Sequence, residues 1–260
     1  MSIHPTAIIE AGAKIGADVE IGPFCHVGEK VRLGNGVRLV SHVVLEGETE
    51  IGDNTLIRPF AVLGGPPQHL GCNGEGTKLV IGSSVRICEH VTMNRGTQRG
   101  GGVTRVGDGG FFMAASHVAH DCQIGDDVIF ANNATVGGHV VVGEKAFLGG
   151  LTGIHQQCRI GAFSFIGGGA VVVNDVIPYA SAFGNHARLV GLNIIGMKRS
   201  GMARDVVHEL RTAYQTLFSD EPVFKERIEL VRRRFGAREE VVRILEFIEQ
   251  GSTRPLMPAR

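Results

Sequence analysis

A large apolar residue recurs at every sixth position over most of the first 172 residues of this 260-residue chain. The series comprises Ile3, Ile9, Ile15, Ile21, Val27, Leu33, Leu39, Leu45, Ile51, Ile57 and Leu63, then Ile81, Ile87 and Met93, then Phe112, Val118, Ile124, Phe130, Val136, Val142, Leu148, Ile154, Ile160, Ile166 and Val172. A period of six matches neither the 3.6-residue period of an α-helix nor the alternation of a simple strand. Hexapeptide repeats are typical of parallel β-helices, in which each coil consists of three short strands closed by turns.

A second position of the repeat fits the inside of such a coil. A small residue lies four positions after the large one, as at Cys25, Cys122 and Ala134, and glycine often follows the large residue directly. We expect the large residue to point inward, the small one to fill the narrow corner, and glycine to let the backbone bend. The repeat therefore predicts a mainly β chain with some α-helix, whose residues 1–190 form a left-handed parallel β-helix.

Two insertions and one change of period divide the chain further. Glycine-rich stretches at residues 64–80 and 97–105 lack a core position, and insertions in a solenoid emerge as loops, often on the binding face. Neutral surface additions are the alternative. The repeat ends at Pro178; we expect residues 179–201 to be a transition and residues 191–260 to form a C-terminal helical domain.

The C-terminal part has the period of α-helices. Apolar residues that follow Asp205 on one helical face are Val206, Val207, Leu210, Tyr214, Leu217 and Phe218. Pro222 should end that helix, and residues 223–235 and 239–248 are predicted to form two more. Helices at this end can cap the β-helix and shield its strand edges.

Composition predicts a soluble, cytoplasmic protein. The five cysteines show no CxxC pairing, and three of them occupy small positions of the repeat, which is typical of a reducing compartment. The chain shows no signal-peptide pattern and no run of about 18 apolar residues. Residues 197–260 carry 13 Lys and Arg against 10 Asp and Glu. This mildly basic tail suits an acidic partner, or is a solvated helical face, and is too weak for nucleic-acid binding.

The spacing of the repeat gathers several histidines. Three hexads make a coil of 18 residues, so the hexads that start at Val118, Val136 and Ile154 should stack on one face. Neighbouring strands lie about 4.8 Å apart. The residues that we expect to share one strip of this face are His117, His120, Asp121, His139 and His155.

This strip allows two kinds of chemistry. Histidines from neighbouring coils could bind a metal ion, or one of them could act as a general base among polar substrate-binding neighbours. The second is favoured by His120-Asp121, because an adjacent acid can orient the ring and raise its basicity. Ser116, Cys122 and Thr135 fill or flank small positions of the repeat, so no nucleophile stands out. Direct transfer to an activated hydroxyl fits better, and scattered surface histidines are the remaining alternative.

An ordered set of motifs closely resembles the UDP-N-acetylglucosamine O-acyltransferase family (LpxA type) of hexapeptide-repeat acyltransferases. The motifs are Ile3-His4-Pro5-Thr6-Ala7-Ile8, Met93-Asn94-Arg95-Gly96-Thr97, Ser116-His117-Val118-Ala119-His120-Asp121-Cys122, Ala131-Asn132-Asn133-Ala134-Thr135, Gly138-His139, Ile154-His155-Gln156, Gly184-Asn185-His186-Ala187 and Gly191-Leu192-Asn193. The resemblance covers essentially the whole chain.

The resemblance implies a reaction and a set of partners. An (R)-3-hydroxyacyl group would pass from acyl carrier protein to the 3-hydroxyl of UDP-N-acetylglucosamine, the first step of lipid A biosynthesis. No metal or other cofactor is implied, since the acyl group rides on the phosphopantetheine of the carrier protein. The family is trimeric, so we expect a homotrimer with sites between subunits and the basic tail facing the acidic carrier protein.

The resemblance also implies roles for individual residues. The implied roles are His120 as general base, Asp121 as its orienting partner, His117, His139, His155 and Gln156 on the sugar nucleotide, Asn193 and Arg199 on the nucleotide or the phosphopantetheine from a neighbouring subunit, and Gly168 and His186 at the end of the acyl-chain pocket. A glycine at position 168 would leave room for a long chain.

The chain departs from the family pattern at three places. His69-Leu70-Gly71 stands where the family usually carries an acid-x-Lys pair that contacts the substrate. Ile195 and Ser200 stand where it often carries an acid and a second arginine. These changes leave open a related acceptor, for example a 3-amino analogue of the sugar, whose product would be an amide.

Other activities stay open at this point. The related N-acyltransferase of the same pathway has an additional N-terminal domain, whereas here the hexads begin at Ile3. CoA-dependent acetyltransferases share the repeat but lack the segment 116–122 with stacked histidines. A metal-dependent hydratase of the γ-carbonic-anhydrase type also uses histidines on a β-helix, and a module that only binds carrier protein would show no turnover.

Overall fold

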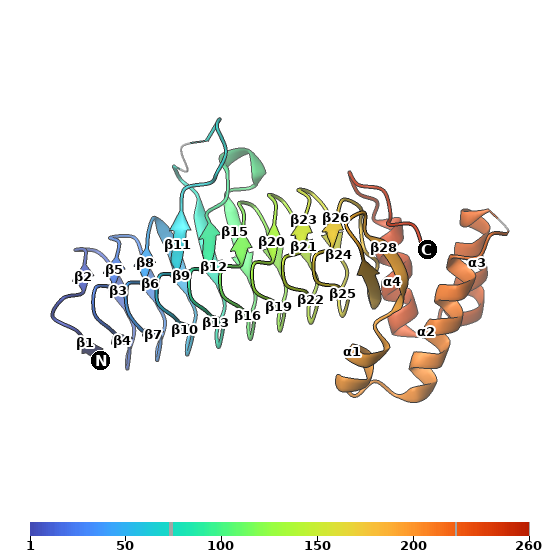
Figure 1. The fold of residues 1–260 in the computed structure, drawn as a ribbon, viewed down its shortest axis with the longest axis horizontal. Coiled ribbons are helices and arrows are strands. Elements are labelled where there is room, and N and C mark those ends of the chain that lie inside the picture. Colours follow the sequence, from blue (N-terminus) through green and yellow to red (C-terminus); the bar gives the residue numbers. More distant parts are fainter. Residues whose placement is uncertain (73–74, 222, 260) are drawn as a thin grey trace.

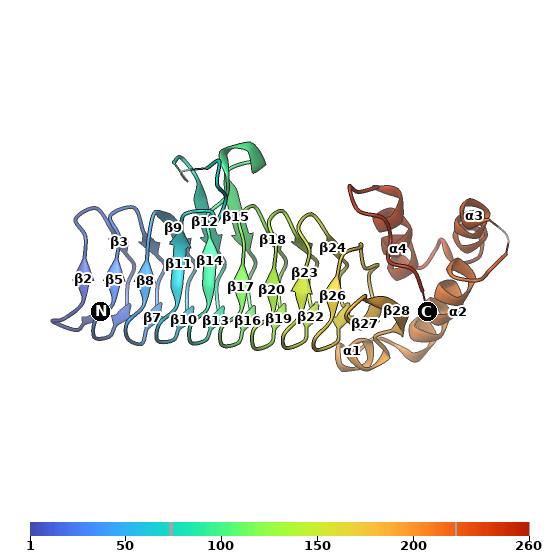
Figure 2. The ribbon, with the colours of Figure 1, turned by 45° about the horizontal axis from the view of Figure 1, so that its top comes forward.

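The six-residue repeat winds the chain into a left-handed parallel β-helix with α-helices at its C-terminal end, which confirms the predicted fold class (Figure 1). The computed structural model describes residues 1–72, 75–221 and 223–259. Within these residues each coil contributes short strands to three sheets, and the strands of one sheet follow one another along the axis (Figure 2).

The strands of each sheet share one face of the β-helix. The first sheet consists of β1 (Ser2–Ile3), β4 (Glu20–Ile21), β7 (Arg38–Leu39), β10 (Leu56–Ile57), β13 (Arg86–Ile87), β16 (Phe111–Phe112), β19 (Ile129–Phe130), β22 (Phe147–Leu148), β25 (Phe165–Ile166), β27 (Ala180–Phe183) and β28 (Arg188–Leu192). The second consists of β2 (Ile8–Ile9), β5 (His26–Val27), β8 (Val44–Leu45), β11 (Val62–Gly65), β14 (Thr92–Asn94), β17 (His117–Val118), β20 (Thr135–Val136), β23 (Gly153–Ile154) and β26 (Val171–Val172). The third consists of β3 (Lys14–Ile15), β6 (Arg32–Leu33), β9 (Glu48–Ile51), β12 (Lys78–Ile81), β15 (Val103–Val106), β18 (Gln123–Ile124), β21 (Val141–Val142) and β24 (Arg159–Ile160).

Backbone pairing fixes which residues of successive coils lie above one another. Val118 of β17 pairs with Val136 of β20, and Val136 pairs with Ile154 of β23. The register is therefore 18 residues per coil here, as the repeat predicts. An insertion lengthens the interval without disturbing the pairing, since Ile57 pairs with Ile87.

The large residue of each hexad forms the core. Leu45 and Phe130 are 0% exposed, and so are Cys122 and Ala134 at the small positions. The first coil is the exception: Ile3 is 40% exposed, and Ile9 and Ile15 are half-buried, because their strands pair with a neighbouring coil on one side alone. Apolar burial of this kind contributes roughly 25 cal/mol per Å² and holds the coils together.

Both insertions leave the β-helix at the same corner, between the second and third sheets. The first connects β11 to β12, and the second connects β14 to β15. They rise side by side above the coils in both views (Figures 1 and 2). Residues 73–74 of the first insertion lie outside the described residues.

The C-terminal part begins with a hairpin. β27 pairs with β25 in parallel and with β28 in antiparallel orientation. The short helix α1 (Ile194–Arg199) follows. Residues 179–201, expected to be a transition, contain this hairpin and α1. Strands of four and five residues and a six-residue helix are too short to show a period in the sequence.

Three longer helices complete the described chain, close to the predicted ranges: α2 (Arg204–Leu217), α3 (Phe224–Phe235) and α4 (Glu239–Glu249). Pro222, the expected helix breaker, lies outside the described residues. No helix in the described ranges is both long enough and apolar enough to cross a membrane. We propose to divide the chain into two domains at residue 190, within β28.

The last residues return to the β-helix. We call residues 252–259 the C-terminal segment. Its Leu256 forms a parallel bridge with Asp175, its Ala259 forms one with Leu189, and its Met257 is 1% exposed. The segment is therefore fixed against the last coils.

Candidate active site

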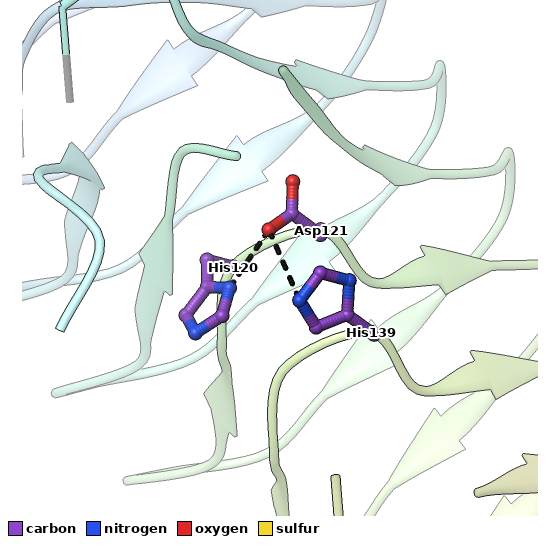
Figure 3. Close-up of side chains that lie close together, drawn as sticks. All are labelled: His120, Asp121 and His139. Atoms are coloured by element: carbon purple, nitrogen blue, oxygen red, sulfur yellow. Dashed lines mark hydrogen bonds and ion pairs between the residues drawn. The ribbon is translucent and has the colours of Figure 1, made fainter. Parts of the chain in front are cut away.

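The corner that carries the insertions also carries His120, Asp121 and His139. His120 and Asp121 form the turn after β17, and His139 lies in the turn after β20, one coil further on. The backbone N–H of His139 donates to the carbonyl of His120 at 3.0 Å. Figure 3 shows the two imidazoles on either side of the Asp121 carboxylate. The stacking predicted from the repeat is therefore present.

The Asp121 carboxylate is the centre of this group. Its Oδ2 lies 2.8 Å from Nδ1 of His120 and accepts a hydrogen bond of 2.7 Å from the Thr97 hydroxyl. Its Oδ1 accepts a bond of 2.8 Å from the Thr97 backbone N–H. Nε2 of His139 lies 3.6 Å from Oδ2. The Asp121 side chain is fully buried, and these donors compensate for its desolvation.

These donors also set the protonation state of the carboxyl group. Burial alone would raise the pKa of Asp121, but the hydrogen bonds from Thr97 and His120 and the charge of His139 outweigh burial and lower that pKa below 3.8. Asp121 is therefore ionised at neutral pH. An ionised carboxylate only accepts hydrogen bonds, so the Nδ1 of His120 must be the donor. In the neutral ring this leaves Nε2 with a lone pair, which is the atom that a general base needs.

Glycines allow the second insertion to close over this carboxylate. A Cβ at Gly100 would lie 2.2 Å from Cγ of Asp121, a distance that no real side chain tolerates. A Cβ at Gly138 would lie 2.5 Å from Cε1 of His120. Thr97 caps the short 3₁₀ turn Gln98–Gly100, accepting the Gly100 N–H on its hydroxyl. Glycine at position 100 is therefore a steric requirement of the site.

His117 lies in β17, before the turn. Its Nδ1 is 2.7 Å from the hydroxyl of Thr92, the residue that it pairs with in β14. Burial, and then the charge of the neighbouring His120, lower the pKa of His117 below 6.5. His117 is therefore neutral at pH 7 and can exchange hydrogen bonds with a polar ligand.

His69 comes to the site from the first insertion. Its ring meets the ring of His120 edge to face, with centroids 5.8 Å apart and planes at 86°. Its Nδ1 accepts the backbone N–H of Gly71 at 3.1 Å. The segment His69-Leu70-Gly71, noted in the sequence as a departure from a pattern, thus places an imidazole directly beside His120.

His155 and Gln156 lie at the same corner, one coil beyond His139. Both are exposed. Both contact Arg254 of the C-terminal segment: Nη2 of Arg254 is 2.6 Å from Nδ1 of His155, and Nε of Arg254 donates to the Gln156 carbonyl at 3.1 Å. These two residues therefore share the strip with His120 but contact the tail of the chain.

The remaining predicted site residues lie elsewhere on the subunit. Asn193 caps α1, accepting the Gly196 N–H at 2.9 Å, and Arg199 is exposed at the end of that helix. Gly168 follows β25, and His186 lies in the turn between β27 and β28. His120 lies at the corner between the second and third sheets, whereas Gly168 lies between the first and second sheets. Asn193 donates to the Phe163 carbonyl in the turn between the third and first sheets, and Figure 1 shows α1 on the opposite side from the insertions. Within one subunit these four residues therefore do not share the corner of His120.

A metal ion is the other ligand to consider at this corner. Among the residues that the structure describes, His120, Asp121 and His139 are the one group whose three potential ligand atoms lie within 4.8 Å of one another. The Nδ1 of His120 carries the proton donated to Asp121, and both Asp121 oxygens accept bonds from Thr97. The Nδ1 of His120 and both oxygens of Asp121 are therefore already engaged in hydrogen bonds, which these atoms would have to give up to bind a metal ion.

Sequence reasoning missed three residues of this corner. Thr97 opens an insertion whose conformation has no period, although the glycines after it indicate a close approach of backbone to a neighbour. His69 was visible only as a departure from a pattern. Arg254 lies 99 residues from His155, and no spacing rule relates the two.

Comparisons with known proteins show which family this chain resembles. The family model described as "Udp N-acetylglucosamine O-acyltransferase; Domain 2" matches residues 175–257, and the bacterial transferase hexapeptide model matches residues 12–47 and 104–138. A protein of Caulobacter vibrioides named acyl-(acyl-carrier-protein)–UDP-N-acetylglucosamine O-acyltransferase is 54% identical over 100% of this chain and 99% of its own length. A protein of the same name from Rhizobium johnstonii is 46% identical over 98% of this chain and 93% of its own. The crystal structure of UDP-N-acetylglucosamine O-acyltransferase from Moraxella catarrhalis is 38% identical, covers 99% of this chain and 100% of its own, and has a TM-score of 0.94.

The lowered pKa of His117 predicts a pH-dependent stability. Below pH 6.5 the unfolded chain binds a proton at this position that the folded chain resists, so stability is lost as the pH falls from 6.5 toward the folded-state pKa. In His117→Asn, whose amide can still bond Thr92, urea unfolding should depend less on pH between about pH 7 and 5. Asp121 acts in a separate window below 3.8, because its pKa is lowered.

The matched control for this measurement is His208→Asn, on the exposed side of α2. It should keep the parental pH dependence. An unchanged pH dependence in His117→Asn would contradict the role of burial at this histidine.

Proposed function

This chain belongs to the UDP-N-acetylglucosamine O-acyltransferase family, and we propose that it transfers an (R)-3-hydroxyacyl group from acyl carrier protein to the 3-hydroxyl of UDP-N-acetylglucosamine. This reaction is the first step of lipid A biosynthesis. The observation that carries the proposal is the hydrogen bond from His120 Nδ1 to buried Asp121, which leaves Nε2 available at the insertion corner.

His120 acts as the general base in this proposal. Its Nε2 takes the proton of the sugar hydroxyl while the oxygen attacks the thioester carbonyl, and Asp121 stabilises the imidazolium that forms. The C–S bond then breaks, and the proton passes to the departing phosphopantetheine thiolate. An ester and a free thiol result, and no oxidant or metal takes part in this balance.

The thiol nearest to His120 in sequence supports direct transfer without a covalent intermediate. Burial raises the pKa of Cys122 to about 12, and its Sγ is turned to the carbonyl of Gly137 at 3.1 Å. Ser116 is 0% exposed. Neither can present an activated nucleophile at neutral pH, because a thiol reacts as its thiolate.

We assign the sugar nucleotide to the strip around His120. His117, His139, His155 and Gln156 would bind it, since all four present polar side chains at or beside the same corner. Imidazole and amide groups can donate to the oxygens of a sugar or a diphosphate. His139 is suited to this because 38% of its side chain is exposed.

We propose that a homotrimer completes the site. Asn193 and Arg199 would reach the nucleotide or the phosphopantetheine from a neighbouring subunit, and Gly168 and His186 would line the acyl-chain pocket. The proposal accounts for the distance of these four residues from His120 within one chain. Gly168 is exposed and carries no side chain, which leaves space for a long acyl chain.

The donor is acyl carrier protein, which meets the basic tail. The last turn of α3 carries Arg232, Arg233 and Arg234. Arg232 is ion-paired with Glu249 of α4, and the exposed Arg233 and Arg234 supply the positive charge that attracts an acidic partner. The acyl group travels on the carrier's own phosphopantetheine, so the enzyme needs no resident cofactor. We place the reaction in the cytoplasm; in support, no cysteine of the described chain forms a disulfide.

Replacing His120 tests the general base. His120→Ala should lower kcat by about 10²- to 10⁴-fold in an assay with acyl carrier protein and UDP-N-acetylglucosamine. Its oligomeric state should stay parental, because His120 lies outside the apolar core. His208→Ala on α2 is the control and should keep parental turnover. Near-parental kcat in His120→Ala would exclude the assigned base.

Mixing two inactive variants tests the shared site. His120→Ala and Arg199→Ala should each be weakly active alone. When unfolded and refolded together they form mixed trimers, in which some sites combine an intact His120 from one subunit with an intact Arg199 from its neighbour. Turnover should therefore rise above the average of the two variants. No gain on mixing would contradict the intersubunit arrangement.

A further inference from the structure

The C-terminal segment holds Arg254 in a defined place. The carbonyl of Pro255 accepts the backbone N–H of Asp175 at 2.9 Å, and the Met257 N–H donates to the Asp175 carbonyl at 2.8 Å. Asp175 is itself fully buried, and its Oδ2 accepts from Nε of Arg159 at 2.7 Å. Main-chain bonds directly after Arg254 thus tie this residue to the coil that follows His155.

Arg254 contacts the coil of His155 at two points. Nη2 lies 2.6 Å from Nδ1 of His155, and Nε lies 3.1 Å from the carbonyl oxygen of Gln156. Arg254 is half-buried, whereas His155 and Gln156 are exposed. The guanidinium therefore contacts the imidazole at Nδ1, and His155 remains exposed.

This contact fixes the tautomer of His155. A guanidinium carries only donors and stays protonated in proteins, so Nδ1 of His155 must be the acceptor. The Gln156 carbonyl also lies 3.2 Å from Nδ1, but a proton on Nδ1 would then face the Arg254 N–H. Arg254 itself donates to that carbonyl, which leaves the carbonyl satisfied without a histidine proton. The proton of the neutral ring is therefore on Nε2.

His120 has the opposite tautomer. Its Nδ1 donates to Asp121, which leaves Nε2 as an acceptor, whereas Nε2 of His155 is a donor. At the turn position of His120, the next coil has Gly138 and the coil after that has Gln156, so His155 lies two coils beyond His120 and one residue before the aligned position. The ring of His139, from the coil between them, packs against His120 with centroids 5.2 Å apart. This corner thus offers a proton acceptor, Nε2 of His120, to a substrate hydroxyl and an N–H donor, Nε2 of His155, to a substrate oxygen.

We propose that Arg254 is a positioning residue, which fixes His155 as an Nε2–H donor toward an oxygen of the acyl acceptor. The inference rests on the proposed function for the identity of that acceptor, a sugar nucleotide, and on the structure for the tautomer. The proposal extends the site to the C-terminal segment, which packs against the last coils of the β-helix.

The kinetic test uses a cycle of two substitutions. Arg254→Met should raise KM for UDP-N-acetylglucosamine about 10-fold, the equivalent of one oriented hydrogen bond, and leave kcat within about 2-fold. In a His155→Gln background the glutamine amide places an N–H near the position of Nε2. This amide is a donor with or without Arg254, so Arg254→Met should then change KM less than about 2-fold. Equal effects of Arg254→Met in the two backgrounds would overturn the proposal.

Two further variants separate positioning from folding. Arg254→Lys keeps one donor and should recover part of the lost affinity. Thr253→Val, which removes a weak contact with Gln157 of 3.5 Å from the same segment, should keep parental KM. A rise in KM with Thr253→Val as large as that with Arg254→Met would indicate a merely structural role.

Neutron diffraction of the parental protein tests the tautomer without any substrate. Deuterium should lie on Nε2 of His155 and be absent from its Nδ1. Deuterium on Nδ1 would overturn the inference even in an active enzyme. Conversely, absence of acyl transfer by the parental protein would reject the proposed function, while the diffraction result would still decide the tautomer.

Discussion

Parallel pairing between successive coils is the constraint on which the rest of this structure depends. Each strand bonds to the strand one turn earlier, so the sequence interval of one turn decides which side chains share a corner. Val118, Val136 and Ile154 show this interval at the site. Because insertions are absorbed outside the pairing, the same corner can carry both loops and histidines. The paired strands thus form a rigid frame, and the residues in the turns supply the chemical groups of the site.

The turn residues of the site have unfavourable backbone conformations and a buried charge, which the surrounding structure must stabilise. Asp121 and His139 both have a left-handed backbone with φ of 60°, which is unfavourable for residues other than glycine. Asp121 is also a fully buried carboxylate. The second insertion compensates for its burial, because Thr97 gives two hydrogen bonds and the glycines beside it admit no side chain. An ionised, immobile carboxylate then holds His120 with its lone pair outward. Arg254 has the opposite effect on His155, so one corner presents an acceptor and a donor imidazole.

The parts of the chain that repeat with a fixed period were predicted from the sequence, and the parts without a period were not. The repeat alone predicted the stacking of His120 and His139, since it fixes the number of residues per coil. It could not place Thr97 or Arg254, because a loop and a terminal segment fold through particular contacts that no spacing encodes. The hairpin of β27 and β28 was missed for the same reason. Asn193 and Arg199 were proposed from family resemblance, and within one chain nothing brings them to the histidines.

The position of the acceptor hydroxyl relative to His120 decides whether this corner performs acyl transfer. The most direct measurement is a crystal structure of the protein with UDP-N-acetylglucosamine bound. The sugar 3-hydroxyl oxygen should lie within about 2.6–3.2 Å of Nε2 of His120, with Asp121 still bonded to Nδ1. A sugar hydroxyl held by other side chains, out of reach of His120 Nε2, would contradict the assignment of this histidine as the base.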